Sequence, residues 1–514
     1  MKAHLQKPLW ALFLLIIVSC GGDDDYTPTE TSDTEKPSPP TNLRISNSTE
    51  TSLQLNWDSA TDNVGVIGYN VFQNDNIVFE GVDTNSTTIS GLTPNTNFEF
   101  YITALDAAGN ESEPSTSVNT IRDTESPTPP TNLTATNKTE TSLQLNWDAA
   151  TDNVGVVKYA VFQNGNLINN EVTGTSLPIQ NLTAETEYSF SVIAFDAEEN
   201  ESESSEILNT CTLAITLEYK TNLSEMGVFT GSLSNMEPAE GVQLYEINST
   251  LFTDYAKKQR LVRLPNCETM QYKGSDLLPE FPDNTLISKT FYYNKNDQDP
   301  SEGKIIIETR ILLKINGNWQ VGNYIWNEAQ TEAVYTENGS VKPISYTNSD
   351  NETLNIDYQI PSKQDCFTCH NNNNTTLPIG MKLRSMNFTP SYTNQNQLAY
   401  LESIGMMEGV TSENISVLPD WADDATYDIL ERGRAYIDVN CAHCHQPGGA
   451  VTNFNIDFRL ETPFADTGIY ANRGEIEARV QSTTPVYMMP QLGRTIVHEE
   501  AVTMLLEYLE AIER

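Results

Sequence analysis

Basic residues are scarce in this sequence. Only 29 Lys and Arg stand against 70 Asp and Glu in 514 residues, which gives a formal net charge of −41. Because binding to nucleic-acid phosphates needs a basic face, this charge argues against a nucleic-acid partner. The acidic excess is consistent with a protein kept soluble outside the cell. A chain of this length exceeds what one hydrophobic core organises, so we expect several domains.

Long apolar runs are also lacking. The run from Leu9 to Val18, preceded by Lys2 and Lys7, is too short to span a bilayer comfortably and is typical of an export signal. It ends in Ile-Val-Ser-Cys, which resembles a bacterial lipobox, and the resemblance implies removal of residues 1–19 and acylation of Cys20. The alternative is an ordinary signal peptide, with Cys20 removed or unmodified.

The segment that follows Cys20 is short, polar and acidic. Gly21 to Asp25 resembles the acidic export tag of Bacteroidetes surface lipoproteins, and the resemblance implies a lipid anchor in the outer membrane with the protein on the cell surface. A plain flexible tether is the alternative. Residues 20–37 carry almost nothing to bury, so we predict a disordered tether there.

Histidine and cysteine are few, with five His and seven Cys, and they are concentrated in two C-x-x-C-H motifs. In this pattern the two thiols attach covalently to the vinyl groups of haem, and the adjacent His binds the iron. Zinc is the alternative occupant of paired cysteines. The sequence therefore predicts two covalently bound haem c groups, held by Cys366, Cys369 and His370 and by Cys441, Cys444 and His445.

Two further cysteines, Cys211 and Cys267, belong to neither motif. In an oxidising compartment they can pair and tie two domains together. Two unrelated thiols are the alternative.

An internal repeat with an offset of 90 residues predicts two similar domains, 38–122 and 127–212. Short alternating runs between Asn, Gly and Thr turns favour β-sandwiches, and the pattern resembles fibronectin type III domains. The resemblance implies two core tryptophans, two tyrosine corners and a role as spacer or adhesion unit. We interpret two shared aspartates as turn formers rather than calcium ligands. These residues are Trp57 and Trp147, Leu92 with Tyr101, Leu182 with Tyr188, and Asp62 and Asp152.

Residues 213–360 predict a separate β-rich domain, in which Asn316-Gly317 is a hairpin signal. Its tryptophans are expected in the core. Arg260, Arg263 and Arg310 are candidates for pairing haem propionates, although ordinary salt bridges are commoner for such residues. The sequence assigns this domain no function.

Residues 424–514 resemble a class I cytochrome c: a helix over 425–439, a C-x-x-C-H motif, a Met-Pro loop and a helix over 499–513. The resemblance implies that Met489 is the sixth iron ligand of the second haem, opposite His445. Met488 is the alternative ligand.

The first haem lobe, predicted over 361–423, has a proximal ligand, His370, but no Met-Pro loop. Candidates for its sixth ligand are Met381, Met386 and His498. We expect His443 to point away from its own haem. An open position on the first iron is a further alternative.

Residues 240–514 together resemble an uncharacterised family of secreted bacterial dihaem c-type cytochromes. The predicted fold class is multidomain: two all-β sandwiches, a β-rich domain and a mainly α, cytochrome c-like dihaem region. The resemblance implies a membrane-anchored carrier of single electrons, whose partner is a redox protein or an extracellular electron acceptor. Two alternatives are a dihaem peroxidase or oxidase with an open first haem, and an adhesion or glycan-binding lipoprotein.

Overall fold

The computed structural model describes residues 32–512 except 50, 94–95, 121–122 and 452–455. The predicted signal peptide and Cys20 lie outside the described residues. Within the described part of the chain, no helix has both the length and the apolar character needed to cross a membrane.

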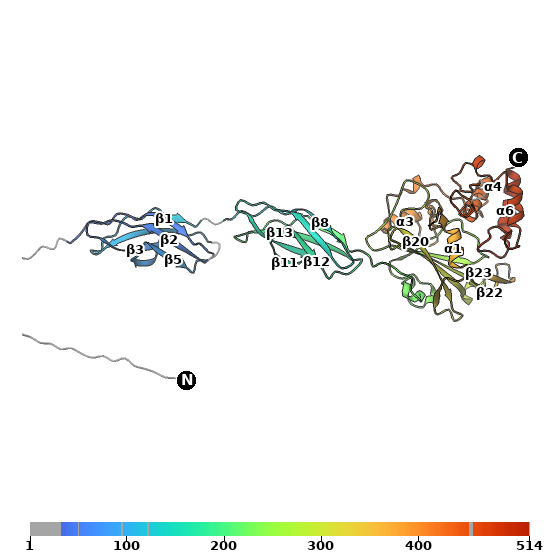
Figure 1. The fold of residues 1–514 in the computed structure, drawn as a ribbon, viewed down its shortest axis with the longest axis horizontal. Helices are drawn as coiled ribbons and strands as arrows, with labels where there is room; N and C mark the ends of the chain where they lie inside the picture. Colours follow the sequence, from blue (N-terminus) through green and yellow to red (C-terminus); the bar gives the residue numbers. More distant parts are fainter. Residues whose placement is uncertain (1–31, 50, 94–95, 121–122, 452–455, 513–514) are drawn as a thin grey trace, which may run out of the picture. The chain divides into compact units, whose positions relative to one another are not determined.

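The first repeat forms a β-sandwich, as predicted (Figure 1). Alternating side chains of its central strand, among them Leu53, Leu55 and Trp57, are buried between two antiparallel sheets, which is the pattern expected of a strand with one face on the core. In hydrogen-bonded order the sheets are β1 (Thr41–Ser46), β2 (Ser52–Asp58), β5 (Ser86–Ser90), and β4 (Asn76–Val82), β3 (Val66–Gln73), β6 (Glu99–Asp106), β7 (Val118–Asn119).

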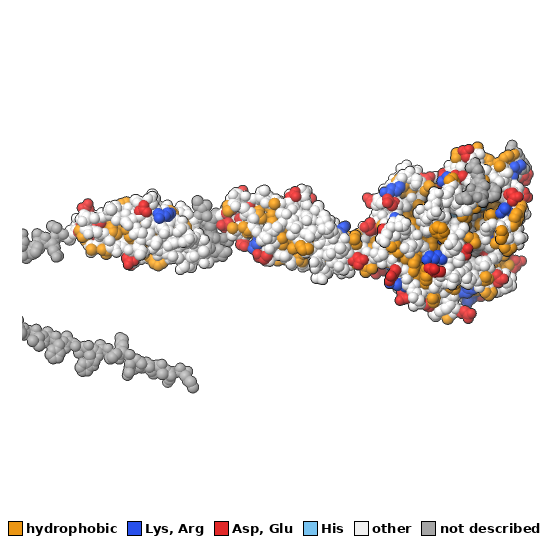
Figure 2. Space-filling view, in the orientation of Figure 1, with side chains coloured by type: hydrophobic (Ala, Val, Ile, Leu, Met, Phe, Trp, Pro, Cys, Tyr) orange, Lys and Arg blue, Asp and Glu red, His pale blue; other side chains and the backbone are white. Residues whose placement is uncertain are grey.

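The second repeat has the same strand order, and Trp147 is buried as predicted. Figure 2 shows few Lys and Arg side chains on the visible face of either repeat, in keeping with the scarcity of basic residues. The sheets are β12 (Ser176–Ile179), β9 (Leu143–Asp148), β8 (Thr131–Thr136), and β11 (Asn166–Val172), β10 (Val156–Gln163), β13 (Glu187–Asp196), β14 (Leu208–Cys211).

The tyrosine corner is present in the second repeat, where the backbone N–H of Thr183 donates to the hydroxyl of Tyr188 at 2.9 Å. The prediction for the first repeat was wrong. Tyr101 points outward and stacks on Phe72, with ring centroids 4.6 Å apart. The offset of 90 places Phe98 at the corner position, and Phe98 has no hydroxyl to accept this bond.

The two aspartates of the repeats form turns, as predicted, although Asp62 also lies in a group with Asp33 and Asp106 whose ligand atoms are within 4.8 Å of one another. One carboxylate oxygen of Asp62 accepts from the backbone N–H groups of Val64 at 2.9 Å and Gly65 at 2.8 Å. Asp152 makes the same pair of bonds in the second repeat. This side chain-to-backbone bonding is why Asp is favoured in such turns.

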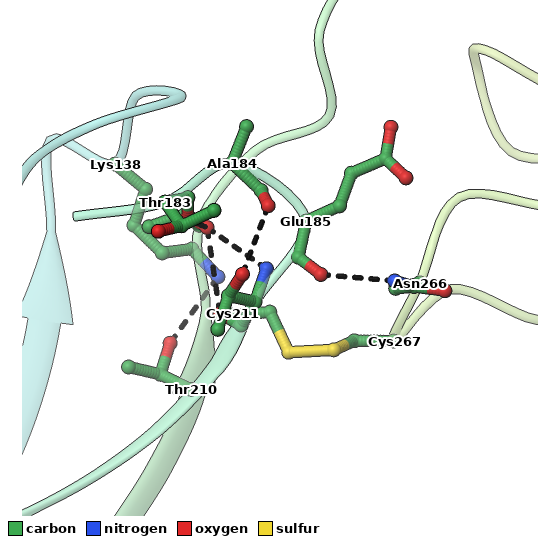
Figure 3. The surroundings of a disulfide bond; sticks show 10 residues. Lys138, Thr183, Ala184, Glu185, Thr210, Cys211, Asn266 and Cys267 are labelled. Carbon is green, nitrogen blue, oxygen red and sulfur yellow. Dashed lines mark hydrogen bonds between the residues drawn. A yellow bond between two sulfur atoms is a disulfide. The ribbon is translucent and has the colours of Figure 1, made fainter.

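A disulfide joins Cys211, at the end of β14, to Cys267 (Figure 3). Beside it the side-chain amide of Asn266 donates to the carbonyl of Glu185 at 3.0 Å. The sequence left open whether these two cysteines pair or are unrelated thiols, and the structure contains the disulfide.

The domain after the repeats is built on a six-stranded antiparallel sheet. Asn316 and Gly317 make the tight turn between β19 (Lys304–Ile315) and β20 (Asn318–Trp326), as predicted, and Trp319 and Trp326 are buried. In order the strands are β15 (Val242–Leu244), β16 (Lys257–Arg263), β18 (Leu286–Asn294), β19 (Lys304–Ile315), β20 (Asn318–Trp326) and β21 (Ala333–Thr336).

Side chains of this sheet enter three cores. On one face Tyr324 and Trp326 pack with Leu223 and Val228 of the segment that precedes the sheet. A third core lies under the hairpin of β22 (Ser340–Thr347) and β23 (Thr353–Ile360). Short 3₁₀ helices span Leu223–Met226, Leu233–Asn235, Pro300–Glu302, Ser412–Asn414 and Phe464–Asp466.

The other face of the sheet shares its core with the region after residue 360. Val262, Ile287 and Leu312 pack in one cluster with Cys366 and Leu383. Around Val262 and Ile287, residues 213–360 therefore share their core with the later region, whereas the buried residues of the core under the β22–β23 hairpin all come from residues 213–360. Parallel pairing across the predicted boundary supports the same conclusion, since β17 (Met270–Gln271) pairs with β26 (Met407–Glu408).

The region after residue 360 is not mainly α, which corrects that part of the predicted fold, and it shows no cytochrome fold. Its helices are short and separated by loops rich in Asn, Gly and Pro, residues that favour turns. The helices are α1 (Lys363–Cys369), α2 (Leu383–Met386), α3 (Gln397–Ser403), α4 (Ile429–Asn440), α5 (Arg473–Val480) and α6 (Glu499–Ala511), and β24 (Asn371–Asn372) pairs with β25 (Thr375–Thr376).

The two helices predicted near the C-terminus are present as α4 and α6, which pack together. Gly433 allows this approach, because a Cβ at this position would lie 2.2 Å from the ring of Tyr508. Asp428 caps α4 by accepting from the N–H groups of Leu430 and Glu431.

Candidate cofactor site

The first C-x-x-C-H motif lies at the C-terminal end of α1, and the second begins where α4 ends. Ser362 caps α1 through a capping box with Asp365, and Cys366 and Cys369 then lie one turn apart on the same helix face. The second motif begins at Cys441, where α4 ends, and continues as a tight turn in which the N–H of His445 donates to the carbonyl of Cys441. The local sequence thus places both pairs of thiols at the ends of capped helices.

The first motif borders a cavity of about 270 Å³. Cys366, Cys369 and His370 all belong to its lining. Strands β16, β18 and β19 contribute four basic residues to the same lining, namely Lys258, Arg260, Lys289 and Arg310. The cavity is therefore shared between the six-stranded sheet and the first motif.

His370 is held as a neutral imidazole with one nitrogen already engaged. Its Nδ1 donates to the carbonyl of Leu377 at 2.8 Å, which leaves Nε2 for a metal. Burial, reinforced by the nearby charge of Lys289, lowers the pKa of His370 to about 3. A neutral imidazole with a fixed orientation is the form that ligates iron, so this residue fits its predicted role.

The second motif borders a larger cavity of about 770 Å³. Cys441, Cys444, His445 and Met489 all line it, so the structure brings the predicted sixth ligand to the same cavity as the predicted proximal one. Burial, followed by the charge of His443, lowers the pKa of His445 to about 4. Both axial candidates of this site are thus available in the form that binds a metal.

The two cavities meet at the motifs. Cys369 and His443 line both of them. The ligand atoms of Cys369, His443 and Cys444 all lie within 4.8 Å of one another. The loop after the first motif also contacts the loop after the second, where the N–H of Asn373 donates to the carbonyl of Gly448 at 2.8 Å.

His443 belongs to the lining of both cavities. It is 8% exposed, and its Nδ1 is buried with no hydrogen-bond partner among the described residues. Spacing within its own motif could not reveal this position, because the cavity wall comes from a segment more than 70 residues earlier. Only three side chains, Cys369, His443 and Cys444, lie close enough together among the described residues to bind one zinc ion, because Cys366 and Cys441 are outside this cluster.

None of the three candidates for the sixth ligand of the first haem lines the first cavity. Met381 and Met386 are fully packed in the core beneath the sheet. His498 stacks on Phe252 with ring centroids 4.0 Å apart and shares a hydrogen bond of 3.1 Å with the hydroxyl of Tyr436. These side chains contribute to packing in the structure.

The comparisons with known proteins concern the repeats. The family model of the fibronectin type III domain matches residues 38–121 and 128–210. The chain is 45% identical over 190 residues to chitinase A1 of Niallia circulans, covering 36% of this chain and 27% of that protein. It is 36% identical over 192 residues to exoglucanase B of Cellulomonas fimi, covering 35% and 17%, and 40% identical over 123 residues to chitinase Chi52 of Paenibacillus xylanexedens, covering 23% and 22%.

The two sandwiches are fibronectin type III domains. The chain spans about a quarter or less of the length of these relatives, which are a glucanase and two chitinases. These matches to chitinases and glucanases contradict the predicted function as a carrier of single electrons. Neither the family match nor these relatives support membership of a cytochrome c family.

Proposed function

We propose that this chain is an exported, carbohydrate-active protein whose fibronectin type III domains hold a cofactor-bearing C-terminal region close to a polysaccharide. The similarity of the repeats to chitinases and glucanases carries the proposal. The lipobox-like segment ending at Cys20 supports export and attachment to the outer membrane by a lipid anchor.

The first repeat offers a surface suited to sugar rings. Strand β4 is exposed along most of its length, and Phe79 is 39% exposed. Phe72 and Tyr101 stack on neighbouring strands of the same sheet. Aromatic rings bind the apolar C–H faces of sugars through their negative π-faces. The second repeat has Asn169 and Ser191 at the positions of Phe79 and Tyr101, so these two aromatic side chains distinguish the first repeat.

For the C-terminal region we propose two covalently attached haem c groups, held at the two C-x-x-C-H motifs. His370 and His445 are the proposed proximal ligands, and Met489 is the proposed ligand opposite His445. The residues fit the groups: both His side chains are neutral, the thiols face cavities, and the first cavity presents buried positive charge. When bound, haem iron supplies redox chemistry.

Hydrolysis by a pair of carboxylates is less well supported at the first cavity, because its acidic residues are engaged. Asp365 bonds to Ser362 within the cap of α1. Asp438 and Glu461 both pair with Arg384, at 3.0 and 2.9 Å. A general acid or base needs a carboxylate that is free to exchange a proton.

Co-sedimentation of the full chain with insoluble chitin and with cellulose tests the carbohydrate part of the proposal. We expect binding to at least one of them and a loss of about tenfold in affinity for the double variant F79N/Y101S, in which the first repeat takes the residues of the second. Y470S, at a 48% exposed tyrosine of the C-terminal region, is the matched control. Absence of binding to either polysaccharide would contradict the carbohydrate proposal, and full binding by the double variant would contradict the assigned surface.

Mass spectrometry of the full chain, produced in cells that attach haem c, tests the cofactor part. We expect two haem additions on the intact protein, one of which is lost in C366S/C369S and the other in C441S/C444S. Bound zinc in place of haem would overturn this part of the proposal.

A further inference from the structure

We propose that the six-stranded sheet is one wall of the first haem site, and that Arg260, Lys289 and Lys258 bind the two propionate groups of that haem. The inference rests on the proposed haem at Cys366 and Cys369. It gives residues 213–360 a function, which the sequence alone did not.

Three of the basic residues lie in one row across adjacent strands. Arg260 of β16 is the register partner of Lys289 of β18, and Lys289 is the register partner of Arg310 of β19. Directly opposed side chains on neighbouring strands share a face and are about 5 Å apart, and like charges in such pairs are destabilising. All three of these cations line the first cavity. Their mutual repulsion would be reduced by an anion bound in that cavity, so we expect one there.

Arg260 is the residue with the greatest need for a partner. It is 7% exposed, and its side chain has no hydrogen bond or ion pair among the described residues, with a buried Nε that lacks an acceptor. Burial lowers the pKa of this guanidinium. A buried charge without a counter-ion costs several kcal/mol. Glu246 is near enough to act on this charge but forms no ion pair with it, so among the described residues Arg260 lacks a bound anion, and a ligand could supply one.

The two lysines are in a similar state. Burial, together with the charges of Arg260 and Arg310, lowers the pKa of Lys289 to about 7. The Nζ of Lys258 donates to the carbonyl of Leu251 at 2.8 Å and lies 5.8 Å from the ring centroid of Phe291. Neither lysine has a carboxylate within ion-pair distance among the described residues.

Arg310 differs because it already has a counter-ion. It pairs with Glu308, a fully buried carboxylate on the same strand. The cavity wall therefore carries more positive charges than the neighbouring carboxylates neutralise. The acidic residues elsewhere in the lining, Asp365, Asp438 and Glu461, are engaged by the contacts described above.

Haem matches this arrangement through its two ends. Its vinyl edge attaches to the cysteines, and its two propionate carboxylates extend from the opposite edge of the porphyrin. Both the thiols of the first motif and the cations of the sheet belong to the lining of the first cavity. A haem with ionised propionates can bond covalently to the cysteines and also supply negative charge to the cations of the same cavity.

The test uses the full chain with C366A/C369A, so that the first site binds haem reversibly while the second remains loaded. Haemin and its dimethyl ester are titrated separately, because esterification removes both propionate charges. We expect haemin to bind about tenfold or more tightly than the ester, and R260Q to remove most of this difference while leaving the affinity for the ester unchanged. R263Q, an arginine of the same strand that does not line the cavity, is the matched control.

Two results would overturn the inference: equal affinity for haemin and its ester with Arg260 present, or an equal loss for both ligands in R260Q. Absence of haem from the cysteine-intact chain is a different outcome, because it would overturn the proposed cofactor itself.

Discussion

At the scale of single residues, the most informative positions are those that local sequence patterns could not interpret. Arg260 was one of three arginines with a possible role toward propionates, and ordinary salt bridges were the commoner expectation. The structure separates them, because Arg260 lines the cavity without a partner, whereas Arg310 pairs with Glu308. Strand register, which places Arg260 beside Lys289, depends on long-range pairing and cannot be deduced from composition.

The contact between Gly433 and Tyr508 gives a prediction for stability. G433A should lower the free energy of unfolding by about 1–3 kcal/mol, because the new Cβ would overlap the tyrosine ring. The measurement is urea unfolding followed by circular dichroism. G474A in α5 is the control, since nothing lies within 4 Å of its Cβ and a slight gain is expected there. Equal effects of the two substitutions would show that α4 and α6 do not pack as described.

A second prediction concerns the buried carboxylate of Asp438. Burial opposes its ionisation, but Lys382 and Arg384 outweigh this effect and lower the pKa of Asp438 below its usual value. A lowered pKa in the folded state contributes stability that is present above about pH 4 and is lost as the pH falls further.

D438N should therefore cost about 3 kcal/mol at neutral pH, because it leaves the 3% exposed Arg384 with Glu461 as its remaining partner, and the cost should shrink in acid. D457N, at the less buried pair of Asp457 and Arg459, should cost less than about 1 kcal/mol. Unfolding measured across pH 3 to pH 7 checks both values, and a pH-independent cost in D438N would contradict the assignment.

At the scale of elements, local patterns were sufficient where a segment folds against its own neighbours. The apolar spacing of 499–513 predicted α6, and the Asn-Gly turn predicted the β19–β20 hairpin. The 90-residue repeat predicted both sandwiches. The tyrosine corner of the first repeat was wrongly assigned to Tyr101, because the position equivalent to Tyr188 of the second repeat is occupied by Phe98.

The patterns failed where segments distant in sequence share a core. Residues 213–360 read as a separate domain because composition changes near residue 361. The structure instead packs Val262 and Leu312 with Cys366 and Leu383. The predicted ligands Met381 and Met386 were plausible by proximity in sequence, yet both belong to this core. Which methionine faces a cavity is decided by tertiary packing, and sequence distance does not report it.

The disulfide gives a prediction at this scale. It closes a loop between residues 56 positions apart, so its removal in C211S/C267S should destabilise the surrounding structure by about 2–4 kcal/mol. Thermal unfolding of the double variant, compared with the parent protein before and after reduction, is the measurement. The parent should lose the same stability on reduction, and a parent that is insensitive to reductant would indicate that the two thiols are not paired.

At the scale of the whole molecule, two kinds of part are combined in one chain. The fibronectin type III domains are similar to those of chitinases and glucanases, and they carry the proposed relation to polysaccharide. The C-terminal region brings two cysteine motifs together at adjoining cavities, one of which is lined by unpaired positive charge. The proposal joins these observations: a polysaccharide-associated protein that carries covalently bound haem.

One measurement tests this joint claim most directly. The full chain, produced with haem c attachment, is mixed with insoluble chitin or cellulose, and the sedimented protein is stained for covalent haem after denaturing electrophoresis. The account predicts that the full-length band sediments with at least one polysaccharide and stains for haem. A chain that remains in the supernatant with both polysaccharides, or that sediments without covalent haem, would contradict it.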